Sequence, residues 1–171
     1  NLTKDQRTEV ALISNTNISV SNDTFDRMVE ETLFGDTLRK WCQKVGLLGH
    51  TEDFPDAGAR SEKITVKKAR SFVVNFYMGL ERGKTLSDGE LDYKVYEPYL
   101  TATGVEIDPK YAEIMKSINI LSDDALLLAG QKFLMLHNLQ YKIITEGKKV
   151  TNRKAYRNKA LVESVLCGWS F

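Results

Sequence analysis

The chain has 171 residues, of which 42% are hydrophobic and 27% are charged, and its formal net charge is +1. This hydrophobic content excludes a globally disordered protein and suits one domain with a real core. The near-neutral balance excludes a strongly basic protein, so any contact with a polyanion has to be local.

Cysteine and histidine are scarce, which limits the chemistry. Two cysteines and two histidines cannot build the usual closed zinc site without several carboxylates. We therefore expect no metal and no cofactor, and a reduced cytoplasmic chain. No apolar run reaches the roughly 18 residues that a membrane span needs, so we expect no membrane contact. Because the chain starts at Asn1 rather than methionine, we expect a fragment of a longer protein that folds as one domain over residues 1–171.

Helix signals begin with the first residues. Thr3 and Gln6 form a capping box, which predicts a helix over residues 4–14. The polar stretch SNTNISVSNDT, residues 14–24, then separates this helix from the next.

Two further helices follow, each with a predicted cap. Ser21 or Asn22 is expected to cap the second helix, which ends at Gly35. Asp36 is expected to cap the third helix, which stops at Gly46. The apolar stripes of the two helices consist of Phe25, Met28, Val29 and Leu33, and of Leu38, Trp41, Cys42 and Val45.

The middle of the chain alternates loops with one long helix. Residues 46–63 hold three glycines and one proline and predict a long loop. Thr65 starts a long amphipathic helix that we expect to close at Gly83. Residues 84–104 are predicted to be mostly irregular, with one or two helical turns broken at Pro98.

The last third is again helical. Asp108, followed by a proline, predicts a helix start. Ser122 is expected to cap the most apolar helix, over residues 123–145, whose side chains are apolar around most of its circumference. Thr151 is expected to cap a last helix that ends at Gly168. The sum is an all-α fold, a single domain of about seven helices packed around the central apolar helix.

Catalytic motifs are missing. The sequence contains no phosphate-binding glycine loop of either common type and no H-E-x-x-H. His137 lies in the apolar helix and suits a hydrogen-bonded core histidine, while Cys42 has no histidine nearby in sequence. Asp123 and Asp124 suit the first turn of a helix, where the dipole favours acids. These residues favour a protein without catalytic residues of its own.

The strongest charge feature is KKVTNRKAYRNK, residues 148–159, which contains no acid. Cations and backbone amides at a helix start suit a phosphate, and a tyrosine can stack on a base. The alternative is a solvated basic helix end. The residues expected to contact nucleic acid are Lys148, Lys149, Arg153, Lys154, Arg157 and Tyr156.

A second basic cluster, VKKAR, lies at the start of the long helix. Cations are unfavourable at this end of a helix dipole unless an anion is nearby. We expect Lys67, Lys68 and Arg70 to form an exposed polar face.

The polar stretch 14–24 has two interpretations. Asn15 and Asn17 could bond a ligand, including an adenine edge, in a polar cleft with Gln6 and Arg7 of the first helix. Alternatively, asparagine side chains bond their own backbone and the stretch is a capped linker.

Residues 2–28 resemble the segment that follows the D-G-Q-H-R motif in DGQHR-domain proteins. The matching residues are Gln6, Arg7, Asn15, Asn17, Val20 and Ser21, while the D-G-Q-H-R signature itself is absent. That family comprises ParB-like relatives from bacterial DNA-modification and phage-defence systems. The resemblance implies that this chain is the helical portion after that core, with the chemistry of the core outside it.

Three functions are compatible with these features. The first is a nucleic-acid-associated helical domain of a bacterial or phage regulatory or defence protein, with DNA as its partner. The second is a protein-interaction or oligomerisation module, for which the tyrosine-rich DYKVYEPYL supplies aromatic residues. The third is the helical part of an enzyme whose catalytic core lies elsewhere.

Overall fold

The structure is a computed structural model that describes residues 3, 6, 10, 21–55, 63–85, 99–102, 107–146 and 162–171. Within these residues there are six helices and no strand, which confirms the predicted all-α fold. The helices are α2 (Asn22–Phe34), α3 (Thr37–Val45), α4 (Val66–Thr85), α5 (Pro109–Ser117), α6 (Asp124–Glu146) and α8 (Glu163–Ser170). In this part of the chain no helix is long and apolar enough to cross a membrane.

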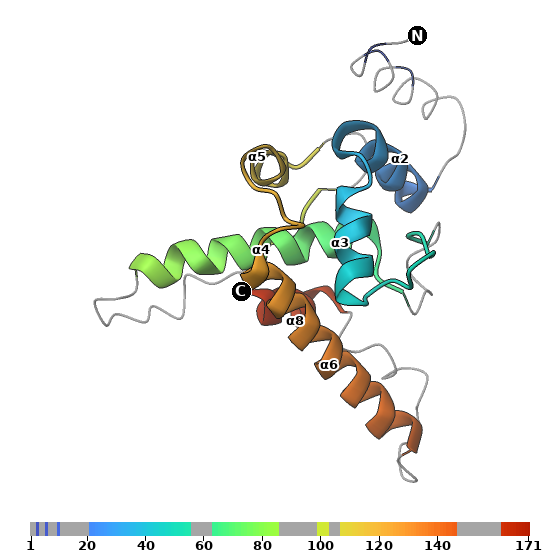
Figure 1. Cartoon of the computed structure of the whole chain (residues 1–171), viewed down its shortest axis with the longest axis vertical. Helices are drawn as coiled ribbons and strands as arrows, with labels where there is room; N and C mark the ends of the chain where they lie inside the picture. Colours follow the sequence, from blue (N-terminus) through green and yellow to red (C-terminus); the bar gives the residue numbers. More distant parts are fainter. Residues whose placement is uncertain are drawn as a thin grey trace.

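The long helix α4 crosses the middle of the molecule (Figure 1). It contacts α2, α3, α5 and α8, whereas α6 packs on α3 and α8. The apolar helix expected at 123–145 is present as α6, and its second half extends away from the other labelled helices (Figure 1). One end of α6 therefore belongs to the core and the other does not.

An aromatic row joins three helices in the core. The ring centroids of Trp41 (α3) and Phe72 (α4) are 5.5 Å apart, and those of Phe72 and Phe133 (α6) are also 5.5 Å apart. Gly130 allows this close packing, because a Cβ there would lie 2.9 Å from Val45 Cγ1 and 3.0 Å from Trp41 Cζ2. The α3 stripe predicted from sequence is fully buried.

Most helix ends follow the predicted capping chemistry. Ser21 Oγ accepts from the backbone N–H of Thr24 at 3.2 Å. Asp108 Oδ1 accepts from two backbone N–H groups at 3.0 and 3.1 Å. Gly46 ends α3 with φ of 88°, a left-handed conformation that glycine adopts without strain. These contacts confirm the predicted boundaries of α2, α3 and α5.

Two predicted caps differ in detail or position. Asp36 is the N-cap residue of α3, as predicted, but its side chain makes no cap bond and its carboxylate pairs with Lys40 Nζ at 3.0 Å. Asp123 rather than Ser122 caps α6, because Asp123 Oδ1 accepts from the N–H of Leu126 at 3.0 Å. An aspartate next to the serine offers a charged acceptor to the positive helix end.

Two predicted helix ends also differ. Helix α4 continues through Gly83 to Thr85, and α8 includes Gly168 and ends at Ser170. Among the described residues, the glycines with a positive φ are Gly35 and Gly46. A helical glycine costs about 1 kcal/mol, which tertiary contacts can offset, so glycine alone does not end a helix. The predicted start of the last helix at Thr151 lies outside the described residues.

Candidate functional site

The predicted nucleic-acid site lies outside the residues that the structure describes: Lys148, Lys149, Arg153, Lys154, Tyr156 and Arg157. The same holds for three members of the predicted polar cleft, Arg7, Asn15 and Asn17. Gln6 is described. Its Oε1 accepts from the N–H of Thr3 at 2.9 Å, and Thr3 Oγ1 accepts from the N–H of Gln6 at 3.3 Å. These bonds form the capping box predicted from sequence.

The prediction that Arg70 belongs to an exposed polar face is wrong, since its side chain is 1% exposed. Arg70 Nε donates to Glu30 Oε2 at 2.9 Å. Its two terminal nitrogens donate to Asp26, Nη1 to Oδ1 and Nη2 to the backbone oxygen, both at 3.2 Å. The acids come from α2, where they lie four residues apart and share the face that packs on α4.

A tyrosine completes this buried cluster. Tyr111 Oη donates to Glu30 Oε1 at 2.6 Å, and the Arg70 guanidinium carbon lies 5.4 Å from the centre of the Tyr111 ring. Burial raises the pKa of Glu30 against the opposing effect of Arg70, and burial also raises the pKa of Tyr111. Burial has the largest effect on the pKa of Glu30, and the nearby Asp26 carboxylate adds a smaller effect in the same direction.

The cluster connects three helices of the fold, but its buried side chains are not accessible to a solute. Asp26, Glu30, Arg70 and Tyr111 are each at most 3% exposed. They join α2, α4 and α5, three helices that are distant in sequence. Since a substrate must touch the groups that act on it, the cluster stabilises and orients helices and is not a candidate active site.

A second polar network holds the segment 99–102 against α4. Asn75 Nδ2 donates to the backbone oxygen of Tyr99 at 2.7 Å, and Asn75 Oδ1 accepts from the N–H of Tyr99 at 3.0 Å. Tyr99 Oη donates to Asp108 Oδ2 at 2.7 Å. Burial and this bond raise the pKa of Tyr99 to about 12. The asparagine side chain thus bonds both backbone polar groups of Tyr99 in a segment without helix bonds of its own.

The residues considered for catalysis have structural environments. Burial raises the pKa of the Cys42 thiol well above its usual value, which disfavours the reactive thiolate. Asp123 caps α6 and accepts from Tyr77 Oη at 2.6 Å, as suits a helix-start acid. His137 is half-buried, and burial lowers its pKa. Within the described part of the chain, His137 Nδ1 is buried without a hydrogen-bond partner, so the expected hydrogen bonding is not met at this nitrogen.

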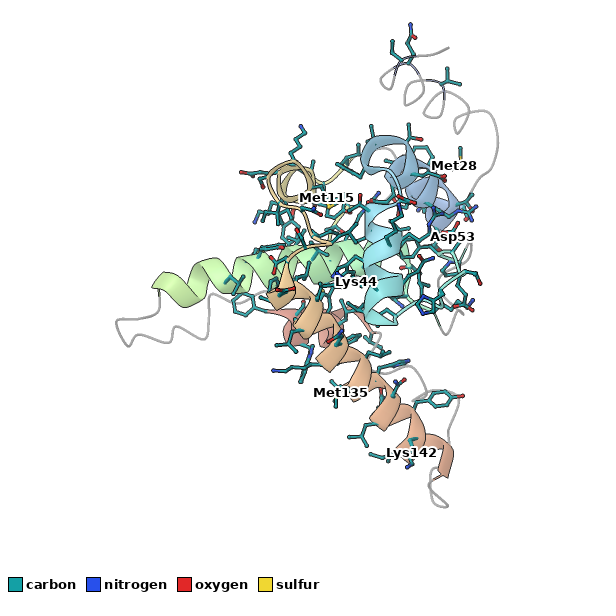
Figure 2. All side chains as sticks on the ribbon, viewed as in Figure 1. Met28, Lys44, Asp53, Met115, Met135 and Lys142 are labelled. Atoms are coloured by element: carbon teal, nitrogen blue, oxygen red, sulfur yellow. The ribbon has the colours of Figure 1, made fainter. Side chains whose placement is uncertain are left out.

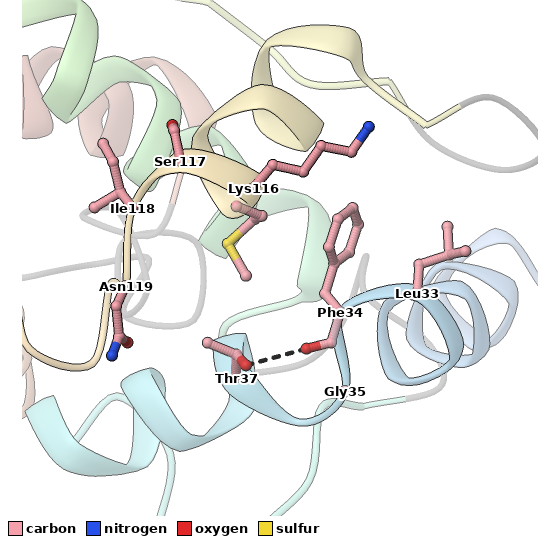
Figure 3. Close-up of a pocket in the computed structure, with 9 residues that line it drawn as sticks. Leu33, Phe34, Gly35, Thr37, Lys116, Ser117, Ile118 and Asn119 are labelled. Atoms are coloured by element: carbon pink, nitrogen blue, oxygen red, sulfur yellow. Dashed lines mark hydrogen bonds between the residues drawn. The ribbon is translucent and has the colours of Figure 1, made fainter. Parts of the chain in front are cut away.

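A pocket of about 600 Å³ lies between the α2–α3 junction and the end of α5 (Figure 3). Phe34 and Met115 line its apolar part, and its exposed polar residues are Lys116, Ser117 and Asn119. The Thr37 hydroxyl donates to the backbone oxygen of Phe34 at 3.0 Å. Because its long polar side chains are in solvent, this pocket offers little of the buried, oriented polarity that fixes a small ligand.

Large apolar side chains gather on one exposed face of α6 and α8. Met135 is 70% exposed, Ile143 60%, Leu139 56%, Leu128 51% and Trp169 46%. We call these five residues the α6–α8 surface. Four of them lie on α6 at spacings of seven and four residues, which places them on one side of the helix. Figure 2 shows Met135 on the part of α6 that projects from the other helices.

The surface is hollowed along α6. A groove of about 650 Å³ is lined by Met135, Leu136, Leu139 and Trp169, with Lys132 and Lys142 among its lining residues. A second hollow of about 350 Å³ shares Lys132 and Trp169 with the first and includes Leu128. The two hollows therefore lie next to each other along α6.

The sequence predicted that α6 is apolar, but it did not show which side of this helix packs against other helices. The same apolar residue types occur in a core and on an exposed surface, so periodicity alone does not distinguish the two positions. The useful signal is the breadth of the apolar coverage, which exceeds the stripe that one packed face needs. Comparisons with protein-family models, with curated proteins and with solved structures found no match.

Proposed function

We propose that this chain is a protein-interaction module that binds a helical segment of another protein along the α6–α8 surface. The main evidence is the group of five large apolar side chains on one face, each between 46% and 70% exposed. Scattered exposed apolar residues are ordinary, but a contiguous group on one side of a molecule marks a binding surface.

The form of the surface favours a helix as its occupant. Met135, Leu139 and Ile143 follow one another at four-residue intervals along a 23-residue helix. Such a row forms a ridge against which a second helix packs. Trp169 of α8 lines the groove beside this row, so both α6 and α8 contribute to the groove. An amphipathic helix laid against an apolar groove is a common mode of recognition between proteins.

The side chains are of the kinds that carry binding energy. Tryptophan is enriched among the residues that dominate interface energetics. Methionine adapts its shape and contacts varied apolar partners. Complete burial of one leucine side chain contributes about 1.5–3 kcal/mol, which corresponds to about 10- to 100-fold in affinity.

A labelled 18-residue amphipathic peptide with a leucine stripe and glutamine flanks tests this proposal by fluorescence polarisation. Leu139→Ser should weaken binding by at least about tenfold, because Leu139 lies in the middle of the surface. Leu100→Ser is the matched control, since Leu100 is 46% exposed but lies outside the α6–α8 surface. Equal affinity of the two variants, or no binding of the peptide to the wild-type protein, would refute the proposal.

A second candidate function is nucleic-acid association in the cytoplasm, and one sequence observation favours it. Residues 148–159 contain six basic residues and no acid. The resemblance of residues 2–28 to DGQHR-domain proteins agrees with DNA as the partner. The proposed contacts are made by Lys148, Lys149, Arg153, Lys154 and Arg157 with phosphates, and by Tyr156 with a base.

A gel shift against single- and double-stranded DNA and RNA at two salt concentrations tests this second candidate. The double variant Arg153→Ala/Arg157→Ala should weaken binding and lower the salt slope by about one per lost phosphate contact. Lys116→Ala is the control, because this exposed lysine lies on α5. Unchanged affinity in the double variant would remove this candidate. Leu139→Ser should not affect it.

A further inference from the structure

We infer that the helix bound by the α6–α8 surface carries one carboxylate, from aspartate or glutamate, inside its apolar stripe, where it faces Lys132. This inference rests on the proposed interaction function. It goes further by assigning the partner a charge at one position, with a large apolar side chain about one helical turn to either side.

Lys132 lies inside the exposed apolar row of α6. At about 100° per residue, it is about 40° around the helix from Leu128, while Leu139 and Ile143 are at about 20° and 60° in the same direction. Its side chain is exposed, and in the part of the chain that the structure describes its ammonium group makes no ion pair or hydrogen bond. Asp124, at the start of α6, is eight residues away, which is about 12 Å along the helix axis. The row therefore contains a cation without a counter-charge.

This lysine also lies where the two hollows meet. The α6 residues that line the larger hollow run from Lys132 to Lys142, and those that line the smaller hollow run from Ala125 to Lys132. Trp169 of α8 lines both hollows as well. Lys132 and Trp169 therefore stand between one hollow and the next.

Both hollows suit apolar side chains of a partner. Three residues that line the smaller hollow have small side chains or none, which leaves room for a large side chain: Gly79, Ala125 and Ala129. The larger hollow is lined by large apolar side chains that include Met135 and Leu139. Residues three or four apart share one face of a helix. A bound helix can thus place one apolar side chain in each hollow and the residue between them opposite Lys132.

A helix with a wholly apolar stripe fits this arrangement less well. It would take water from the ammonium group of Lys132 without offering an acceptor, which costs free energy unless the side chain bends away. A carboxylate at the central position pairs with the ammonium group, while the aliphatic stem of Lys132 stays among apolar side chains. A charged pair within an apolar contact fixes the register and the choice of partner more than it adds affinity.

Four labelled 18-residue peptides with the same leucine stripe and glutamine flanks test the inference by fluorescence polarisation. Three of them carry glutamate, glutamine or lysine at the central stripe position, and the fourth carries glutamine there and one glutamate on the opposite face. We expect central glutamate to bind about three- to tenfold more tightly than central glutamine, and central lysine to bind most weakly. The fourth peptide should bind like the glutamine peptide, because its carboxylate cannot reach Lys132.

Substitutions of the lysine test the same pairing from the other side. Lys132→Met should remove the preference for central glutamate, and Lys132→Glu should make the lysine peptide the tightest of the four. Lys116→Met is the matched control, because Lys116 is an exposed lysine on α5, and it should leave the order unchanged. Urea unfolding shows whether each variant keeps the stability of the wild-type protein.

Each failure has its own meaning. Equal binding of the four peptides, with loss in Leu139→Ser, overturns the central carboxylate and keeps the proposed function. Tighter binding of both glutamate peptides would reflect net charge alone and also overturn the inference. No binding of any peptide, the all-leucine stripe included, overturns both proposals. Sedimentation that shows a dimer lost in Leu139→Ser would make a second copy the occupant. Binding to phosphatidylcholine–phosphatidylglycerol vesicles through this surface, without preference among the peptides, would overturn the inference in favour of a lipid surface.

Discussion

Replacing Arg70 by methionine should be one of the most destabilising single changes in this chain. Methionine keeps much of the volume but removes the guanidinium that bonds Glu30 at 2.9 Å and Asp26 at 3.2 Å. Two carboxylates are then left at 1% and 4% side-chain exposure without that cation. Removing one partner of a buried ion pair costs about 3–5 kcal/mol. Domains are stable by only about 5–15 kcal/mol, so this change removes about a fifth of the stability or more.

The assay is urea unfolding followed by circular dichroism, with the free energy of unfolding taken from the midpoint and slope. Arg39→Met is the matched control: Arg39 pairs with Asp53 at 3.3 Å and with Asp36 at 3.5 Å, but its side chain is 27% exposed. Such a pair contributes about 0–1 kcal/mol. Adding Glu30→Gln to Arg70→Met should recover part of the loss, because one buried charge disappears. If Arg70→Met costs no more than Arg39→Met, the reasoning on burial is refuted.

Three further predictions concern single positions. Gly130→Ala should cost about 1–3 kcal/mol in urea unfolding because its Cβ meets α3, whereas Gly168→Ala, with no neighbour within 4 Å, should not destabilise α8. Asp108→Ala should cost about 1–2 kcal/mol by losing a cap with two bonds, and Asp36→Ala, which removes no cap bond, should cost less. Burial raises the pKa of Glu30, so the folded state keeps a proton that the unfolded state releases above about pH 4.5. Stability should therefore fall as pH rises from there through the raised pKa, and Glu30→Gln should flatten that fall in unfolding curves measured from pH 4 to 8.

Local chemistry made much of the fold predictable. The α3 stripe, the cap at Asp108 and the left-handed end at Gly46 all depend on residues within one or two turns of each other. Such features are determined by residues that lie close together in sequence, and tertiary contacts in this protein reinforce them. The predicted core helix also exists as α6, because a long apolar pattern is stable as a helix only when part of it is buried.

Long-range pairing was the part that local patterns could not give. Arg70 looked like one cation among several at a helix start, but its partners lie 40 and 44 residues earlier in the chain. Asn75 likewise bonds the backbone of Tyr99, which is 24 residues away. The signal that was available is the pair Asp26 and Glu30 on the apolar face of α2, where unpaired acids would be too costly to bury.

The division of α6 explains how the proposed binding face can coexist with a stable fold. In its first half, Leu126 and Phe133 are fully buried and anchor the helix against the core. The same backbone hydrogen bonds carry the helix on to Ile143, so the exposed row is held by a continuous helix and not by a loop. A face held in this way loses little conformational entropy on binding, which favours affinity. Stability should therefore depend on the anchored half and recognition on the exposed half, and substitutions should separate the two.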